Sequence, residues 1–227
     1  VVVVEADEYD RSFLKLHPSV AVITSMDADH LDIYKTAAAF EDAFVSFSEK
    51  VKAGGLLLAK KGLAREASFD TSKLVTYSLN GTGASIYAKD ITVVNGAYTF
   101  TAVGPSWQIE ELVLNMGGLH NIENALVATS VAVHLGIDSE KIKIALANFA
   151  GVKRRFEYLV KTNEQVLIDD YAHHPAELAA LISGVRSLYS NQKLTLVFQP
   201  HLFSRTQDLC DGFAQSLSAA DEVVLLP

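Results

Sequence analysis

The chain has 227 residues, a formal net charge of −8 and one cysteine. Its length suffices for one large domain or two modest ones, and its acidic balance argues against a broad nucleic-acid-binding surface. The single cysteine, Cys210, excludes an internal disulfide. No apolar run is long enough to span a bilayer, so we expect no membrane insertion. Because the chain begins inside the apolar run Val1–Val4 and without a methionine, we expect it to be a fragment.

Two apolar segments near the N-terminus are each followed by acidic residues. Val1–Val4, which we predict to be the end of a buried parallel strand, precedes Glu5–Asp10, and a second strand at Val20–Thr24 precedes Asp27–Asp32. The carboxyl ends of neighbouring parallel strands meet at one rim of a sheet, and magnesium prefers oxygen ligands. The two clusters together favour a metal site, although acidic residues after strands also serve ordinary turns. His30 is a softer ligand than magnesium prefers.

The next segments predict a helix, a strand and a small antiparallel sheet. Residues Ala37–Val51 have apolar side chains at helical spacing, and Leu56–Ala59 is typical of a buried strand. Residues 74–114 form short alternating runs that are broken by Gly, Asn and Pro. The Asn95–Gly96 pair among them is a strong hairpin signal, so we expect these runs to form antiparallel strands.

A long helix is predicted from Gly118 to His134. On a helical wheel His120 and Asn124 share one polar face, with Asn121 beside them. An amide can both donate to and accept from a purine edge, so this face is a candidate for binding a nucleotide base. A solvated polar face is the alternative interpretation.

A glycine and a basic triplet follow and indicate a domain junction. Gly151 precedes Lys153–Arg155, and arginine in particular can hold phosphate by bidentate hydrogen bonds. The alternative is that these cations only complement the end of a helix. The runs Tyr158–Lys161 and Gln165–Ile168 are then predicted to pair as strands.

The stretch Asp169–Pro175 has the highest concentration of potentially reactive side chains in the chain. It lies between the apolar strand Val166–Ile168 and a predicted helix that begins near Pro175. Ligands of open α/β sheets bind at such strand ends, and a helix start offers free N–H groups to an anion. Two carboxylates, a phenol and two imidazoles here favour a functional site. The alternative is that Asp169 or Asp170 caps the helix and the histidines are solvated.

The last part of the chain predicts a parallel α/β layer. A buried strand at Leu194–Phe198 ends in Gln199–Thr206, a helix runs through Leu217, and another strand follows at Glu222–Leu226. Polar residues again follow a strand end, and Arg205 is the best anion ligand among them.

Taken together, these motifs resemble the Mur ligase family of bacterial cell-wall synthesis. The stretches that carry the resemblance are Glu5–Asp10, Asp29–Asp32, Gly118–Ala125, Arg154–Glu157, Asp169–Pro175 and Gln199–Thr206. The family implies a cytoplasmic, ATP-dependent amide ligase with a UDP-sugar domain, a central ATP-binding domain and a Rossmann-like C-terminal domain that closes over the nucleotide.

This resemblance implies an α/β fold in two parts. Residues 1–150 are expected to form part of the central parallel-sheet, ATPase-like domain, which carries a small antiparallel sheet. Residues 151–227 are expected to form part of the Rossmann-like C-terminal domain, and Ala150–Val152 is the candidate hinge.

Within the family, the motifs are most similar to those of members that join L-alanine to UDP-N-acetylmuramate through an acyl phosphate in peptidoglycan synthesis. One alternative is the family member that recycles murein tripeptide. Another is a non-catalytic nucleotide-binding remnant, because the family's phosphate loop ending in Gly-Lys-Thr or Gly-Lys-Ser is absent from these residues. For the same reason we expect the chain alone to be inactive.

The resemblance also implies roles for individual residues, with ATP and Mg²⁺ as the expected nucleotide and metal. Its metal ligands are Glu5 and His30. Its nucleotide-binding residues are His120, Asn121, Asn124, Arg155 and Asp170. Its substrate-binding residues are Tyr171, His173, His201 and Arg205. Its catalytic residues are His173, Arg205 and Asp170, and whether His173 is a base or a hydrogen-bond donor stays open.

Overall fold

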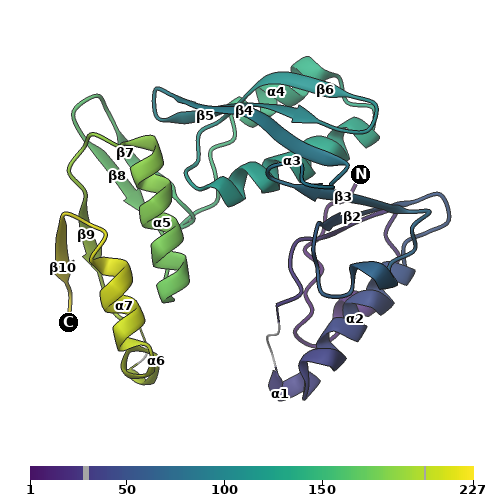
Figure 1. Ribbon diagram of the computed structural model, residues 1–227, viewed down its shortest axis with the longest axis horizontal. Coiled ribbons are helices and arrows are strands. Elements are labelled where there is room, and N and C mark those ends of the chain that lie inside the picture. Colours follow the sequence, from purple (N-terminus) through teal and green to yellow (C-terminus); the bar gives the residue numbers. More distant parts are fainter. Residues whose placement is uncertain (28–30, 202) are drawn as a thin grey trace. The chain divides into compact units, whose positions relative to one another are not determined.

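The computed structural model describes residues 1–27, 31–201 and 203–227, with the side chains of Leu31, Asp32, Ser204 and Arg205 outside the description (Figure 1). The chain forms two compact units. The first unit comprises Val1–Lys89, Ala102–Gln108 and Leu126–Ile137, and the second comprises Asp90–Thr101, Ile109–Ala125 and Asp138–Pro227. No helix in the described ranges is both long and apolar enough to cross a membrane.

The first unit is built on parallel strands. Their bounds are β1 (Val20–Ile23), β2 (Leu56–Lys60), β3 (Leu74–Ser78) and β4 (Ile86–Val94), and each of the first three pairs in parallel with the next. The residues of β4 from Asp90 onward belong to the second unit. The middle of β2 is buried on both faces, as is usual for parallel strands. The strands at Val20–Thr24 and Leu56–Ala59 are thereby confirmed.

An aromatic core packs α2 (Ala37–Glu49) into the first unit. The Thr36 hydroxyl caps this helix by accepting a hydrogen bond from the Ala39 N–H at 3.1 Å. Phe40 and Phe47 on one face of α2 are buried, and the Phe47 ring lies 5.1 Å from that of Phe13. Phe13 belongs to the short helix η1 (Ser12–Lys15), while α1 (Leu31–Tyr34) precedes α2 and η2 (Glu66–Ser68) precedes β3.

The six-stranded sheet has the order β1-β2-β3-β4-β5-β6, with β5 at Ala97–Val103 and β6 at Gln108–Leu114. Asn95 and Gly96 join β4 to β5 with φ values of 51° and 69°, as a two-residue hairpin turn requires. This hairpin is confirmed. The antiparallel assignment of Leu74–Tyr77 is wrong, because β3 pairs in parallel with β2. A short apolar run does not encode the direction of its neighbouring strand.

The expectation for Val1–Val4 is also wrong. These residues form no strand, and all four side chains are exposed. A strand requires a neighbour for its backbone hydrogen bonds, and among the described strands β1 pairs only with β2. The apolar character of the run therefore does not produce a buried strand here.

The second unit contains the elements that follow the sheet. Their bounds are α4 (Ser139–Ala147), β7 (Glu157–Lys161), β8 (Val166–Asp169), α5 (Pro175–Leu188), β9 (Thr195–Phe198), α6 (Phe203–Asp208), α7 (Cys210–Leu217) and β10 (Glu222–Leu225). The helix α3 (Leu119–His134) begins in this unit and continues in the first. The predicted pairing of β7 with β8 and the parallel pairing of β9 with β10 are both confirmed.

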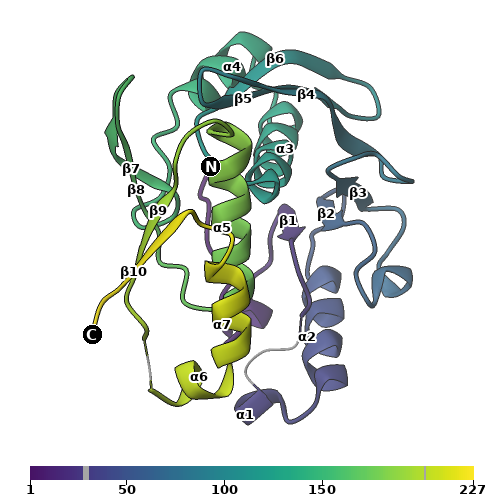
Figure 2. The same ribbon diagram turned by 60° about the vertical axis from the view of Figure 1, so that its left-hand side comes forward.

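Helices α5 and α7 lie side by side, as Figure 2 shows. A small cluster formed by Leu178, Phe198 and Phe213 holds them against β9. The helix expected to run through Leu217 is divided into α6 and α7. At the far end of α5, the Tyr189 hydroxyl donates to the Tyr158 hydroxyl on β7 at 3.0 Å, and burial raises the pKa of Tyr158.

We predict that Phe40→Ala lowers the free energy of unfolding by about 3–5 kcal/mol, because the ring is 2% exposed and its removal leaves a cavity. The matched control is Phe203→Ala, whose ring is 87% exposed and whose loss should change stability by less than about 0.5 kcal/mol. Urea unfolding of both variants measures the difference. Equal losses would contradict the assignment of the aromatic core.

Candidate functional site

The stretch Asp169–Pro175 forms the connection between β8 and α5. His174 is the N-cap of α5, and Pro175 occupies the first helical turn. The Glu177 carboxylate accepts hydrogen bonds from the backbone N–H groups of His173 at 2.8 Å and His174 at 3.2 Å. The cap is therefore a histidine and a glutamate, which rules out the alternative that Asp169 or Asp170 caps this helix.

Asp170 ties two backbone segments together. One carboxylate oxygen accepts from the Phe156 N–H at 2.7 Å, and the other accepts from the Ala172 N–H at 2.8 Å. The first bond reaches back to the segment that carries the basic triplet, and the second closes a local turn. Because hydrogen bonds to an ionised carboxylate are strong, Asp170 fixes the loop against the segment that precedes β7.

Arg154, not Arg155, is the member of the basic triplet that contacts the loop. Its guanidinium lies 5.4 Å from the centre of the Tyr171 ring, and its Nε lies 3.8 Å from the Asp169 carboxylate. The Tyr171 N–H also donates to the Arg154 carbonyl at 2.9 Å. Arg155 is exposed, so its guanidinium is accessible to a ligand.

Tyr171 and His173 lie together within the loop. Their ring centres are 4.8 Å apart, and His173 Nδ1 lies 2.8 Å from the Tyr171 carbonyl oxygen. Glu177 Oε2 lies 3.5 Å from the same nitrogen. The structure thus brings together Asp170, Tyr171 and His173, as predicted from the sequence, and adds Arg154 and Glu177, which the sequence analysis did not assign. The capping-box spacing of His174 and Glu177 is the signal that could have identified Glu177.

The start of α3 packs against Phe156 and against α5 through glycines. A Cβ on Gly117 would lie 2.1 Å from the Phe156 ring, and a Cβ on Gly184 of α5 would lie 2.8 Å from the Gly118 nitrogen. Glycine is required at both places because the backbones and the ring come too close for a side chain. The predicted nucleotide-binding end of α3 and the Asp170 loop are therefore neighbours.

Some of the polar side chains at the start of α3 already form hydrogen bonds within the helix. The Asn121 amide donates to the Gly117 carbonyl at 2.7 Å and accepts from the Asn124 amide at 3.4 Å. His120 and Asn124 are exposed at the surface of the helix. Each amide retains further hydrogen-bonding capacity, so this face stays a predicted site for a nucleotide base.

Only one of the two predicted metal ligands lies within the described residues. Glu5 is exposed in the N-terminal segment, and His30 lies outside the described residues. In the ranges that the structure covers, no group of three or more His, Cys, Asp or Glu side chains could hold a metal ion. Glu5 nevertheless offers an exposed carboxylate, the kind of donor that magnesium prefers. The metal site stays a prediction.

Other acids of the N-terminal cluster serve local turns. Asp7 accepts from the Tyr9 N–H at 2.9 Å, and Asp10 accepts from the Ser12 N–H at 2.9 Å. Hydrogen bonds from Ser12 hold the pKa of the Asp10 carboxyl below its usual range. The turn interpretation therefore accounts for these two carboxylates.

Two substrate-binding candidates follow β9. His201 is exposed, while the side chain of Arg205 lies outside the described residues. Their proximity to Tyr171 and His173 stays a prediction.

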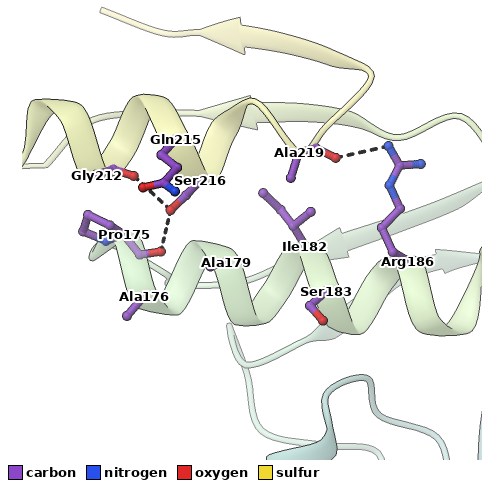
Figure 3. A pocket seen from close by; sticks show the side chains of 10 residues that line it. All are labelled: Pro175, Ala176, Ala179, Ile182, Ser183, Arg186, Gly212, Gln215, Ser216 and Ala219. Carbon is purple, nitrogen blue, oxygen red and sulfur yellow. Dashed lines mark hydrogen bonds between the residues drawn. The ribbon is translucent and has the colours of Figure 1, made fainter.

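A groove of about 490 Å³ between α5 and α7 is a separate feature (Figure 3). Two of its polar side chains already have partners: the Ser216 hydroxyl donates to the Pro175 carbonyl at 2.9 Å, and Arg186 pairs with Asp221 at 2.9 Å. The Arg186 guanidinium also donates to the Ala219 carbonyl, as Figure 3 shows. These contacts belong to helix packing, so we do not assign the groove a ligand.

Comparison with known families gives two matches. Residues 1–132 match the model described as "Mur ligase middle domain", and residues 154–227 match "Mur ligase, glutamate ligase domain".

Similar proteins of known name include the UDP-N-acetylmuramate–L-alanine ligase of Christiangramia forsetii, which is 47% identical over 226 residues, 100% of this chain and 48% of that protein. The ligase of the same name from Porphyromonas gingivalis is 46% identical over 100% of this chain and 50% of that protein. The chain thus spans about half the length of the curated relatives it matches.

Among solved structures, UDP-N-acetylmuramate-alanine ligase from Thermotoga maritima has a TM-score of 0.81 at 27% identity, over 97% of this chain and 48% of that one. A structure of MurF from Acinetobacter baumannii has a TM-score of 0.73 at 20% identity, over 96% of this chain and 48% of that one, which shows a shared fold.

We predict that Asp170→Ala lowers the free energy of unfolding by about 3 kcal/mol, because two backbone N–H groups lose a charged acceptor. Asp170→Asn retains one acceptor oxygen and should show a smaller loss. The matched control is Asp169→Ala, which removes only a long, solvent-exposed ion pair and should cost less than about 1 kcal/mol. Urea unfolding gives these values, and hydrogen exchange at the Phe156 amide locates the change. If the two alanine variants are equally stable, Asp170 does not fix the loop.

Proposed function

Because the chain belongs to the Mur ligase family, we propose that it is the ATP-binding and amino-acid-binding part of an enzyme that joins L-alanine to UDP-N-acetylmuramate. The observation that carries this proposal is the continuous similarity to ligases of that name, at 47% identity over 226 residues. The TM-score of 0.81 to the Thermotoga maritima enzyme supports it. The Christiangramia forsetii and Porphyromonas gingivalis relatives carry that name, which favours this activity over the recycling of murein tripeptide.

The proposed reaction proceeds by activation of a carboxylate. A carboxylate is a poor electrophile, so ATP first phosphorylates the muramoyl carboxylate to an acyl phosphate. The amine of L-alanine then attacks the acyl carbon and displaces phosphate. Phosphoryl transfer depends mainly on positioning and on neutralising charge at the phosphate oxygens. The site therefore has to hold the muramoyl carboxylate in line with the terminal phosphate of ATP and to place L-alanine beside the acyl carbon. It also has to exclude water from the acyl phosphate.

The nucleotide is proposed to lie between the start of α3 and the Asp170 loop. His120, Asn121 and Asn124 would contact the base, and Arg155 would contact the ribose or phosphates. This is supported by the chain of contacts from Asn121 through Gly117 and Phe156 to Asp170. Each oxygen of the Asp170 carboxylate keeps a further lone pair beside its backbone bond, which a ribose hydroxyl could use.

The amino acid and the acyl phosphate are assigned to the other side of the loop, where Tyr171, His173, His201 and Arg205 would bind them. Arg205 would hold a carboxylate or phosphate group by bidentate hydrogen bonds.

Glu5 and His30 would hold Mg²⁺. When bound, the metal neutralises charge on the phosphate oxygens.

We also propose that residues 1–150 and 151–227 are separate domains that close over the nucleotide, with Ala150–Val152 as the hinge. The two family matches leave residues 133–153 between them, which contain this segment. Gly151 has a φ of 84°, which is favourable for glycine alone. Closure of this kind would complete the site and exclude water.

The expected result of an activity assay is phosphate release that depends on L-alanine. The assay uses a longer protein that contains these 227 residues together with a Gly-Lys-Thr or Gly-Lys-Ser loop, and supplies it with ATP, Mg²⁺ and UDP-N-acetylmuramate. The chain by itself should give no turnover, because no such loop is present to hold the ATP phosphates.

Replacing L-alanine with murein tripeptide provides the control for substrate class. Release that depends on tripeptide would favour the recycling activity, and no release with either would favour a non-catalytic nucleotide-binding role.

A further inference from the structure

We propose that His173 is held as the Nδ1–H tautomer and presents Nε2 as the proton acceptor for the amine of the incoming amino acid. The adjacent His174 is held in the opposite tautomer. The tautomer assignments rest on the geometry of the loop alone, whereas the role in proton transfer rests on the proposed ligase function.

The tautomer of His173 follows from the partners of its Nδ1 atom. This nitrogen lies 2.8 Å from the Tyr171 carbonyl oxygen, which can only accept a hydrogen bond. Glu177 Oε2, 3.5 Å from the same nitrogen, is also an acceptor when ionised. The hydrogen therefore has to reside on Nδ1. Because a neutral imidazole carries one hydrogen, Nε2 keeps a lone pair, and no partner for it is found among the described residues.

The loop also fixes the orientation of the His173 ring. The Tyr171 ring packs at 4.8 Å from its centre, and the Glu177 carboxylate accepts from the His173 backbone N–H at 2.8 Å. Glu177 lies in the first turn of α5, a rigid element, so the acceptor beside His173 does not depend on a mobile loop. Tyr171 is itself covered by the Arg154 guanidinium at 5.4 Å.

His174 provides an internal contrast. Its Nδ1 accepts the hydrogen bond from the Ala176 N–H at 3.3 Å as part of the helix cap. A nitrogen that accepts cannot carry the hydrogen of a neutral ring, so the hydrogen resides on Nε2. His174 therefore offers a donor at Nε2, whereas His173 offers an acceptor at the same atom. Of these two histidines, only His173 can take a proton at Nε2 without first changing its tautomer.

The acceptor suits one step of the proposed reaction. An amino acid at neutral pH carries an ammonium group, which has no lone pair for attack. Transfer of one proton to Nε2 of His173 breaks an N–H bond and frees the electron pair that forms the C–N bond. The C–O bond to phosphate then breaks, with its electrons leaving on phosphate, and phosphate takes the second amine proton. The resulting imidazolium carries Nδ1–H directed at the Tyr171 carbonyl beside the Glu177 carboxylate, which stabilises the positive charge. It later returns its proton to solvent.

Nuclear magnetic resonance tests the tautomers directly. The 227-residue chain is labelled with ¹⁵N-histidine, and long-range ¹H–¹⁵N correlations are recorded in alkaline buffer, where imidazoles are neutral. We expect a protonated Nδ1 at His173 and a protonated Nε2 at His174, with the two signals assigned from His173→Asn and His174→Asn. A protonated Nε2 at His173, or the averaged signal of a solvated ring, would overturn the proposal whether or not the chain belongs to an active ligase.

Two substitutions in the longer ligase test the role of the acceptor. The amide of His173→Gln reaches the position of Nε2 and can donate there, whereas that of His173→Asn replaces only the Nδ1 side. If Nε2 accepts a proton, both variants should lose about 100-fold or more in kcat, with little change in KM for ATP. If His173 only donates, His173→Gln should retain most of the activity, and the proposal fails.

The matched control is His174→Asn, which keeps an acceptor at the helix cap and should leave kcat within about twofold of the original enzyme, because a residue outside the proton-transfer step contributes nothing to it. A loss in this control equal to that in His173→Gln would assign both losses to the cap and overturn the proposal. An original enzyme without alanine-dependent turnover would instead refute the proposed ligase function, while the resonance experiment still decides the tautomers.

Discussion

The carboxylate of Asp170 holds together the segments on which the candidate site depends. It accepts backbone hydrogen bonds from Phe156 and from Ala172, so the segment before β7 and the loop before α5 share one anchor. A charged acceptor with two backbone donors gives stronger and more directional bonds than a pair of neutral groups. Through this anchor, Arg154 comes to lie over Tyr171, and Tyr171 in turn packs against His173. The Glu177 carboxylate adds a second anchor by accepting from the backbone N–H groups of His173 and His174.

Two residues next to the Asp170 hydrogen bonds have strained backbone conformations. Arg154 and Phe156 have φ values of 58° and 52°, in the left-handed region that non-glycine residues rarely adopt. Such conformations persist only where the surrounding structure determines them, and they are common near functional sites. Here the Asp170 bond to the Phe156 N–H and the contact of the Phe156 ring with Gly117 provide that constraint. The strain lies between the two segments proposed to contact the nucleotide.

The pattern of apolar residues was sufficient to locate most strands and helices, because burial on one face or both leaves a clear period in the sequence. It was not sufficient where partners decide the outcome. Val1–Val4 has the composition of a strand but no strand beside it, and Leu74–Tyr77 alternates although β3 pairs in parallel. Both errors concern hydrogen bonds to distant segments, which local pattern does not encode.

At the candidate site, the sequence identified the functional stretch but not which of its residues make the structural contacts. Asp169 and Asp170 are adjacent and chemically identical, yet only the fold shows that Asp170 is the one with two backbone donors. In the same way, Arg154 contacts the Tyr171 ring and the Asp169 carboxylate, whereas no contact of the Arg155 side chain with the loop is found among the described residues. The role of His174 as a cap was not foreseen, because histidine is an uncommon residue at that position.

The close approach of Gly184 to Gly118 couples the position of α5 to the position of the start of α3. An α-helix is stiff along its axis, and Gly184 is seven residues from Glu177 on α5, about 10 Å along that axis. Because Gly184 is in close contact with the start of α3, the stiff helix α5 fixes the distance between that contact and its own first turn. A ligand that displaced the start of α3, and α5 with it, would therefore move the carboxylate of Glu177 as well. Ligand binding near Gly184 would in this way shift the hydrogen-bond acceptor beside the His173 ring at the other end of α5.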